Sequence, residues 1–269
     1  NRLKYDGPHK LADLIAAAIS IARKSGAKVA LDVGPTGRLL APAGELAFED
    51  AYAAFAEMVR TGAAAGADLV FIETMSDTRE LKAAVLAAKE NCNLPVWSTV
   101  ALGEDGKLLT GGSVECVATL LEGLGVDAYG LNCGLGPDRM LPYVKRLAAV
   151  ARKPLIVKPN AGMPKLVDGK TVFTVGPDEF AADVAALVDA GVEIVGGCCG
   201  TTPAHIARTV AAVRDKDSHR ALPPKRTRIS SGTSVVELAP HAGLVIGERI
   251  NPTGKKLLKE ALKAGDVAY

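Results

Sequence analysis

Short runs of Val, Ile and Leu alternate along the chain with longer Ala-rich segments whose apolar residues recur at helical spacing. The short runs predict six strands, near residues 28–33, 69–73, 95–101, 127–131, 155–159 and 193–197. The longer segments predict helices that follow these strands, near residues 48–65, 77–91, 113–124, 138–151, 177–190 and 203–214. Repetition of strand and helix in this order predicts parallel strands joined by right-handed crossovers.

Two architectures fit this order, an open doubly wound sheet and a closed eight-stranded barrel. No Gly-x-Gly-x-x-Gly sequence follows the first strand, as a dinucleotide-binding doubly wound sheet would have. Polar and reactive residues instead stand at the C-terminal ends of several strands: Asp32, Glu73, Cys133, Asn160 and Cys198. Contributions from many strand ends favour a (β/α)₈ barrel of the α/β class.

The first predicted strand is preceded by a helix rather than by another strand. Residues 9–25 carry one apolar face at helical spacing, formed by Leu11, Leu14, Ile15, Ala18, Ile21 and Ala22. Six strands can be found where a barrel has eight. We therefore expect the chain to begin inside the second βα unit and to lack the first two strands of the barrel.

Composition narrows the class of protein and of partner. The chain has 269 residues, of which 48% are apolar, so it can bury at least one large core. Its 32 basic and 30 acidic side chains give a formal charge of only +2, which favours neither nucleic acid nor an anionic membrane as a partner. No apolar stretch reaches 18 residues and no signal-peptide pattern opens the chain, so we expect a soluble, cytoplasmic protein.

Three of the five cysteines follow predicted strands. Cys133 ends the segment Gly-Leu-Asn-Cys, and Cys198 and Cys199 lie together in Gly-Gly-Cys-Cys-Gly. Five cysteines are too few for a disulfide scaffold in a chain of this length, so metal binding is the better interpretation. Three thiolates from neighbouring strand ends can bind one Zn²⁺ and leave its fourth position open, as in catalytic zinc sites.

Adjacent cysteines place a condition on this hypothesis. In a regular strand Cys198 and Cys199 would point to opposite faces, so both can reach one metal only where the strand has ended in a turn. The glycines that flank them permit such a turn. Isolated buried cysteines are otherwise packing residues, and we interpret Cys92 and Cys116 in that way. His205 follows the pair closely, but a fourth protein ligand would block the open position, so we expect a structural role for it.

Four segments carry a resemblance to a known family. They are LDVGPTGRLL at 31–40, FIETMSD at 71–77, GLNC at 130–133 and GGCCGTTP at 196–203. Together they resemble the homocysteine S-methyltransferase domain family over about residues 1–215. The later segment IGERINPTGKK, at 246–256, resembles the opening strand and loop of the pterin-binding domain of cobalamin-dependent methionine synthases. This order of domains is similar to that of the modular enzymes.

The resemblance implies an activity and its cofactors. It implies a (β/α)₈ barrel that binds Zn²⁺ through Cys133, Cys198 and Cys199, with homocysteine as methyl acceptor and methylcobalamin as methyl donor. A corrinoid-binding domain or protein is then the implied partner. In the second domain, Glu248 and Asn251 resemble residues of a site for methyltetrahydrofolate. Residues 1–215 would form the first barrel, 216–240 an exposed basic linker, and 241–269 the start of the pterin-binding domain.

Three further polar residues are candidates for binding the substrate. Glu73 ends an apolar strand, where an acid needs a partner, and the resemblance makes the homocysteine ammonium that partner. An ion pair within the barrel mouth is the alternative for Glu73. Asn132 and Asn160 could orient ligands or substrate through their amides, or cap neighbouring loops. Asp32 opens the Gly-Pro-Thr-Gly segment, where we expect it to hold the turn.

The sequence thus predicts a methyltransferase that activates a thiol. A thiol of ordinary pKa is mostly protonated at neutral pH, and coordination to Zn²⁺ would remove that proton. Two alternatives stay open: a stand-alone homocysteine methyltransferase that uses a sulfonium donor, and a zinc-binding scaffold that lacks activity because its first strands are missing.

Overall fold

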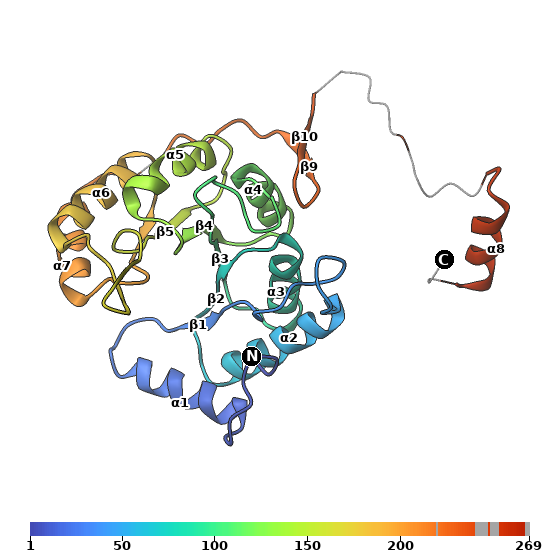
Figure 1. Cartoon of the computed structure of the whole chain (residues 1–269), viewed down its shortest axis with the longest axis horizontal. Coiled ribbons are helices and arrows are strands. Elements are labelled where there is room, and N and C mark those ends of the chain that lie inside the picture. The colour runs from blue at the N-terminus through green and yellow to red at the C-terminus, as the bar shows by residue number, and fades with distance from the viewer. Residues whose placement is uncertain (219, 240–246, 248–252, 267–269) are drawn as a thin grey trace. The chain divides into compact units, whose positions relative to one another are not determined.

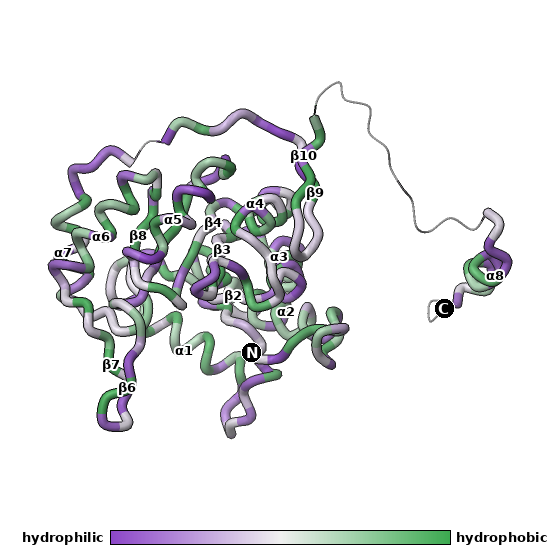
Figure 2. Tube along the Cα trace, turned by 45° about the horizontal axis from the view of Figure 1, so that its top comes forward, coloured by the Kyte–Doolittle hydropathy of each residue, from purple (hydrophilic) through white to green (hydrophobic). Residues whose placement is uncertain are grey.

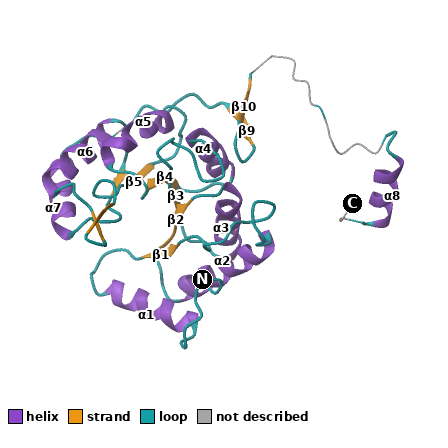
Figure 3. Cartoon of the chain, in the orientation of Figure 1, coloured by secondary structure: helices purple, strands orange, loops and turns teal. Residues whose placement is uncertain are grey.

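The computed structural model describes residues 1–218, 220–239, 247 and 253–266 (Figures 1 and 3). Its main element is a parallel sheet in the strand order β1-β2-β3-β4-β5-β8. The strands of this sheet are β1 (Ala30–Val33), β2 (Leu69–Met75), β3 (Val96–Val100), β4 (Ala128–Asn132), β5 (Leu155–Lys158) and β8 (Ile194–Val195). The helices before and between them are α1 (Leu11–Arg23), α2 (Phe48–Ala64), α3 (Thr78–Asn91), α4 (Val114–Gly123), α5 (Pro137–Ala148), α6 (Pro177–Asp189) and α7 (Pro203–Val213).

The α/β class and all six predicted strands are confirmed, and each predicted helix overlaps an observed one. The sheet curves and the helices lie outside it (Figure 1). Its first and last strands, β1 and β8, do not pair with each other among the described residues, so the barrel is not closed. The sheet therefore has two edges, and β1 forms one of them.

The two faces of each strand have different surroundings. In β1, Leu31 and Val33 are buried against the helices, while Asp32 between them is exposed on the opposite face. In β2 the side chains of Val70 and Ile72 are fully buried, whereas Glu73 is only partly so. This alternation follows from the two-residue period of a strand. The outer face therefore carries the core, and the inner face carries the polar residues predicted to form the site.

Acidic residues accept backbone hydrogen bonds at the N-terminal ends of the strands. We call this edge of the sheet the N-terminal rim. Three acids that directly precede β2, β4 and β8 accept hydrogen bonds from backbone N–H groups where the neighbouring strands begin: Asp68 from Val29 (2.6 Å), Asp127 from Val96 (2.8 Å) and Glu193 from Leu155 (2.6 Å). Two residues before each acid, a glycine with positive φ ends the preceding helix: Gly66, Gly125 and Gly191. A recurring Gly-x-acid sequence thus ends a helix and fixes the position at which the neighbouring strand begins.

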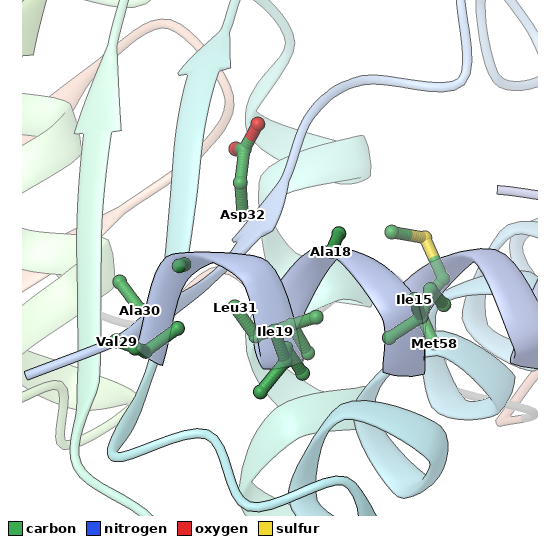
Figure 4. A pocket seen from close by; sticks show the side chains of 9 residues that line it. Ile15, Ala18, Ile19, Val29, Ala30, Leu31, Asp32 and Met58 are labelled. Carbon is green, nitrogen blue, oxygen red and sulfur yellow. The ribbon is translucent and has the colours of Figure 1, made fainter. Parts of the chain in front are cut away.

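The open edge of the sheet is apolar. A groove between α1 and β1 is lined by Ile15, Ile19, Leu31 and Met58, with Asp32 beyond them (Figure 4). Of the predicted apolar face of α1, Leu14 and Ile21 remain exposed. Helix α1 thus packs with only part of its apolar face, because no element among the described residues covers the rest.

Two small sheets were not predicted. One is the antiparallel hairpin of β6 (Lys165–Val167) and β7 (Lys170–Val172), which projects from the loop after β5 with all its side chains exposed (Figure 2). The other consists of β9 (Thr227–Ser230) and β10 (Val235–Leu238). Both lack the buried apolar runs of the main strands, although Asp168-Gly169 between β6 and β7, with positive φ at both residues, is typical of a two-residue hairpin turn.

Sheet β9–β10 lies in the segment expected to be an exposed linker. Strand β9 contacts α4, and the guanidinium of Arg220 donates to three carbonyl oxygens at and beyond the end of α5: those of Ala148 (3.2 Å), Ala151 (2.5 Å) and Lys153 (3.0 Å). Many side chains of the segment are exposed, but its arginines attach it to the first unit. Residues 1–237 form one compact unit.

The second unit comprises residues 238–269. Within its described residues it contains helix α8 (Lys256–Ala264), which ends at Gly265 in the left-handed conformation. Glu248, Asn251 and the strand predicted at 244–246 lie outside the described residues. None of the helices among the described residues combines the length and apolar character needed to cross a bilayer.

Candidate metal and substrate site

The ends of β4 and β8 bring three cysteines together. The Sγ atoms of Cys133, Cys198 and Cys199 all lie within 4.8 Å of one another, and those of Cys133 and Cys199 are 3.8 Å apart. Two thiolates bound tetrahedrally to one zinc, at about 2.3 Å each, are separated by about 3.8 Å. All three cysteines are free. Their number, chemistry and spacing therefore fit one Zn²⁺ with a fourth position left for another ligand.

A turn places both adjacent cysteines on the same side. Strand β8 ends at Val195, so Cys198 and Cys199 lie beyond the regular strand, as the sequence required. The loop after β5 holds this turn: Asn160 Oδ1 accepts a hydrogen bond from the N–H of Cys199 (3.1 Å), and the carbonyl of Pro159 accepts one from Cys198 (2.9 Å). Asn160 is buried and acts here by fixing the metal loop, one of the two roles expected for it.

Cys133 reaches the cluster through an unusual backbone conformation. Its φ of 57° lies in the left-handed region, which is uncommon outside glycine. The N–H of Cys133 donates to the carbonyl of Lys158 (3.1 Å), and its own carbonyl accepts from Leu135 (2.7 Å). These two bonds hold the backbone conformation that turns the thiol toward Cys198 and Cys199.

The thiols of Cys133 and Cys198 influence each other. A hydrogen bond from Cys198 stabilises the thiolate of Cys133 and lowers the pKa of Cys133 to about 7. The same bond, together with burial, raises the pKa of Cys198. The pair thus shares one proton readily, and Cys133 is the first of the two to become a thiolate as pH rises.

Asn132 connects the three cysteines to strands β2, β3 and β4. This fully buried side chain accepts hydrogen bonds at Oδ1 from the N–H of Thr74 (2.8 Å) and the hydroxyl of Thr99 (2.7 Å). Its Nδ2 donates to Thr74 Oγ1 (2.7 Å) and lies 3.5 Å from Glu73 Oε2 and 3.8 Å from Cys198 Sγ. Asn132 therefore links the carboxylate of Glu73 to the sulfur cluster through a single amide group.

Thr74 is strained and is held by Asn132. Its φ of 62° is exceptional for a β-branched residue, and the β2–β3 register shifts between Ile72 and Met75 at this point. Both the N–H and the hydroxyl of Thr74 bond to Asn132. This irregularity could not be predicted, because Thr is an ordinary strand residue.

Glu73 has a partner in the structure. Its Oε2 forms an ion pair with Lys158 Nζ, and the two side chains are 20% and 23% exposed. The ammonium of Lys158 also lies 4.6 Å above the ring of Phe71. The ion pair within the barrel mouth, expected as the alternative for Glu73, is thus present. Lys158 was missed, although a charged residue that ends the apolar run Leu155–Val157 was a usable signal.

Asp32 faces Glu73 rather than holding the turn after β1. Desolvation by the surrounding protein, although the residue keeps solvent-exposed surface, and next the charge of Glu73 raise the pKa of Asp32. The turn is instead held by Glu80, whose Oε1 accepts from both the N–H and the hydroxyl of Thr36, each at 2.6 Å. The expectation for Asp32 was wrong because strand alternation directs its side chain toward the inner face.

His205 has a structural role, as expected. Its Nδ1 is hydrogen-bonded to Thr202, and its Nε2 lies 3.0 Å from the carbonyl of Val175. Both nitrogens are therefore occupied away from the sulfur atoms. Cys116 is buried within α4, and Cys92 donates to the carbonyl of Ala88 at the end of α3, so neither belongs to the cluster.

Two methionine synthases are similar to this chain in sequence. The methionine synthase of Mycobacterium tuberculosis is 38% identical over 75% of this chain and 17% of its own length. That of Mycobacterium leprae is 34% identical over 97% of this chain and 23% of its own length. The chain thus spans less than a quarter of either relative.

Solved structures of the homocysteine methyltransferase MmuM from Escherichia coli have the same fold. The apo form is 25% identical with a TM-score of 0.65, over 77% of this chain and 76% of the other. The metallated form is 27% identical with a TM-score of 0.61, over 74% and 70% of the two chains. Residues 1–213 match the family described as homocysteine S-methyltransferase. The chain belongs to the homocysteine S-methyltransferase family.

Proposed function

We propose that this chain transfers a methyl group to the thiol of homocysteine, giving methionine, as a module of a cobalamin- and folate-dependent methionine synthase. The observation that carries the proposal is the spacing of three free cysteine sulfurs at the strand ends of a homocysteine S-methyltransferase domain. Similarity to the Mycobacterium leprae methionine synthase covers 97% of the chain and so extends beyond residue 213, which favours the modular enzyme.

In this proposal Cys133, Cys198 and Cys199 hold Zn²⁺, and homocysteine supplies the fourth ligand through its sulfur. When bound, the metal lowers the pKa of the coordinated thiol and makes the sulfur nucleophilic at neutral pH. The chain's own contribution is to fix the three ligands: Asn160 holds the Cys198–Cys199 turn, and Asn132 orients the groups around Cys198. Such supporting hydrogen bonds commonly change metal affinity by about 10- to 100-fold.

Glu73 is the proposed site for the substrate ammonium. Its carboxylate lies near the same amide nitrogen as Cys198 Sγ, so one small molecule can reach both groups. Glu73 Oε2 and Cys198 Sγ lie 3.5 Å and 3.8 Å from that nitrogen and so at most 7.3 Å from each other, and homocysteine has three carbon atoms between its sulfur and its nitrogen to span such a gap. Methylcobalamin, when bound, would supply the methyl group that this sulfur accepts. A corrinoid-binding domain or protein presents that donor.

The proposal also covers the rest of the barrel and the second domain. Two further strands between the edges formed by β1 and β8 would close a (β/α)₈ barrel and cover the apolar groove beside α1. Residues 1–215, 216–240 and 241–269 are proposed as barrel, linker and start of a pterin-binding domain. Glu248 and Asn251 are proposed to contact methyltetrahydrofolate there, and the protein is proposed to act in the cytoplasm.

A comparison of methyl donors tests the proposal. Zinc content and methyl transfer to homocysteine are measured on the full-length protein that carries this chain, with methylcobalamin and, separately, S-methylmethionine as donor. Transfer from methylcobalamin, with one zinc per chain, is the expected result. Transfer from S-methylmethionine alone would favour a stand-alone methyltransferase that uses a sulfonium donor. Zinc binding without transfer from either donor would contradict the proposal and favour a scaffold.

A further inference from the structure

Three charged side chains share the inner face of the sheet close to the cysteines. Asp32, Glu73 and Lys158 come from β1, β2 and β5, and Lys158 forms an ion pair with Glu73. Asp32 contacts Glu73 closely enough for the charge of Glu73 to raise its pKa. The group therefore contains two carboxyl groups and one ammonium. Since Lys158 and Glu73 are 23% and 20% exposed, water screens their interaction only in part.

The position of Lys158 is fixed close to the metal ligands. Lys158 is paired in register with Asn132 on β4, and its carbonyl accepts the N–H of Cys133. The ammonium of Lys158 pairs with Glu73 Oε2. This oxygen lies 3.5 Å from Asn132 Nδ2, and Asn132 Nδ2 in turn lies 3.8 Å from Cys198 Sγ. A ligand that binds the cysteine cluster through sulfur and Glu73 through an ammonium must therefore also meet Lys158.

The presence of Lys158 beside Glu73 distinguishes thiols that carry both an ammonium and a carboxylate from thiols that carry an ammonium alone. A substrate ammonium at Glu73 competes with the Lys158 ammonium, because two like charges at one carboxylate repel each other. An amino acid brings its own carboxylate on the carbon atom that carries the ammonium. Lys158 can then exchange Glu73 for the substrate carboxylate, since its flexible stem carries three donors that can rotate to a new acceptor. A thiol with an ammonium but no carboxylate offers Lys158 no such partner.

We propose that Lys158 binds the α-carboxylate of the amino-acid substrate and so selects zwitterionic amino-acid thiols over simple aminothiols. The inference rests on the proposed function, in which sulfur binds at the cysteine cluster and the ammonium at Glu73. In the empty site Lys158 is the counter-ion of Glu73, which avoids an unpaired, largely buried carboxylate. In the occupied site the substrate ammonium takes that place, and every charge of the substrate has an opposite charge beside it.

Three thiol ligands separate the contribution of the substrate carboxylate to binding from that of the substrate ammonium. Homocysteine carries both charged groups, 3-aminopropane-1-thiol lacks the carboxylate, and 4-mercaptobutanoate lacks the ammonium. Calorimetry on the zinc-loaded, full-length protein measures the affinity of each ligand for the wild type and for Lys158→Met, which removes the charge at similar length. Lys145→Met is the matched control, because it removes one lysine charge from an exposed position on α5.

Lys158→Met should weaken homocysteine and 4-mercaptobutanoate by about tenfold or more, the usual effect of losing a hydrogen bond to a charged group. The same variant should bind 3-aminopropane-1-thiol at least as tightly as the wild type, because Glu73 is then free. Lys145→Met should change none of the three affinities. Equal losses for all three ligands, or unchanged or tighter homocysteine binding by Lys158→Met, would overturn the inference.

Two further measurements keep this test independent of folding and of the proposed function. The wild type itself should prefer homocysteine to 3-aminopropane-1-thiol, and Lys158→Arg should retain that preference; loss of preference in the wild type would overturn the inference. Glu73→Gln should weaken homocysteine and 3-aminopropane-1-thiol but not 4-mercaptobutanoate. Failure of the zinc-loaded wild type to bind any of the thiols would instead contradict the proposed function itself.

Discussion

The two rims of the sheet use polar residues in opposite ways. At the N-terminal rim, Asp127 and Glu193 accept hydrogen bonds from the backbone where neighbouring strands begin, in ordinary backbone conformations. At the C-terminal rim, Thr74 and Cys133 adopt left-handed conformations, and three sulfur atoms face one another. The first arrangement fixes the positions at which the strands begin, and the second fixes the positions of the cysteine sulfur atoms. This division matches the general separation of stability and activity between the ends of such strands.

The energetics of the rims differ accordingly. A left-handed non-glycine residue costs about 1–3 kcal/mol and persists only where its surroundings hold it. Asn132 holds Thr74 through two hydrogen bonds, and the carbonyl of Lys158 holds Cys133. A hydrogen bond to a charged group stabilises by about 1.5–3 kcal/mol. The bonds at the N-terminal rim therefore add to the stability of the fold, whereas the strained residues at the C-terminal rim are held by their own local bonds.

The largest effect expected from the comparison is the loss of a metal ligand at the C-terminal rim. Cys198→Ser should lower zinc affinity by more than about 100-fold, because a neutral hydroxyl replaces a thiolate and supporting residues alone can account for 10- to 100-fold. The zinc-free variant should unfold at the same urea concentration as the zinc-free wild type. Zinc titration and urea unfolding measure the two properties.

Cys92→Ser is the matched control for that experiment, since this cysteine lies at the end of α3 and outside the cluster. It should leave zinc affinity unchanged. Full zinc affinity in Cys198→Ser would show that the three cysteines do not share one metal.

The second prediction concerns the N-terminal rim. Glu193→Ala should lower the free energy of unfolding by about 1–3 kcal/mol, because the N–H of the buried Leu155 loses its acceptor. Zinc and homocysteine affinities should not change. Urea unfolding with an unchanged slope measures the loss. Glu193→Gln keeps an acceptor oxygen and should recover most of the stability; a loss of zinc affinity in Glu193→Ala would break the separation of the two rims.

The main sheet was predictable because its strands are nearly continuous apolar runs bounded by glycine and proline. Segments such as Leu69–Ile72 and Leu155–Val157 consist almost entirely of buried apolar residues, which predicts strands. The hairpin β6–β7 has no apolar period because its residues are all exposed, but Asp168-Gly169 between its strands, with positive φ at both residues, was a usable hairpin signal that was missed. Sheet β9–β10 was hidden for a similar reason, as its attachment depends on arginine contacts such as those of Arg220 with backbone carbonyls.

The cysteine cluster was predictable because the carboxyl ends of parallel strands meet at one rim, so that residues distant in sequence converge. The pairings around it were not predictable. That Lys158 reaches Glu73, and that Asn132 holds Thr74, depends on strand register and on a local bulge, which a single sequence does not encode in any simple period. Asp32 was misplaced although the two-residue alternation of its strand, between buried Leu31 and Val33, already assigns its side chain to the inner face.

The third prediction concerns the pH dependence of zinc affinity. Zinc binding displaces thiol protons, so zinc affinity rises with pH. Because the pKa of Cys133 is lowered to about 7, this thiol still releases a proton on zinc binding below that pH but is already a thiolate above it. The slope of log affinity against pH should therefore fall by one proton, a factor of about ten per pH unit, on passing pH 7.

Competition with a chelating dye from pH 6 to pH 9 measures that slope. Glu193→Ala should give the same curve as the wild type, since its change lies at the other rim. A constant slope through this range would show that the pKa of Cys133 does not lie near 7.

The smallest effect on stability is expected at Thr74. Thr74→Gly removes the strain of a left-handed β-branched residue but also removes the hydroxyl that bonds Asn132, so the two effects of about 1 kcal/mol each should nearly cancel. Homocysteine affinity should still fall several-fold, because Asn132 loses one of the contacts that place it between Glu73 and Cys198. Urea unfolding and calorimetry on the zinc-loaded protein measure the two quantities. Thr99→Val is the matched control, since it removes a different hydroxyl partner of Asn132 without relieving strain, and it should lower both stability and affinity. If Thr74→Gly instead binds homocysteine as the wild type does while losing stability, the strained residue serves the fold, and the contrast between the two rims does not extend to Thr74.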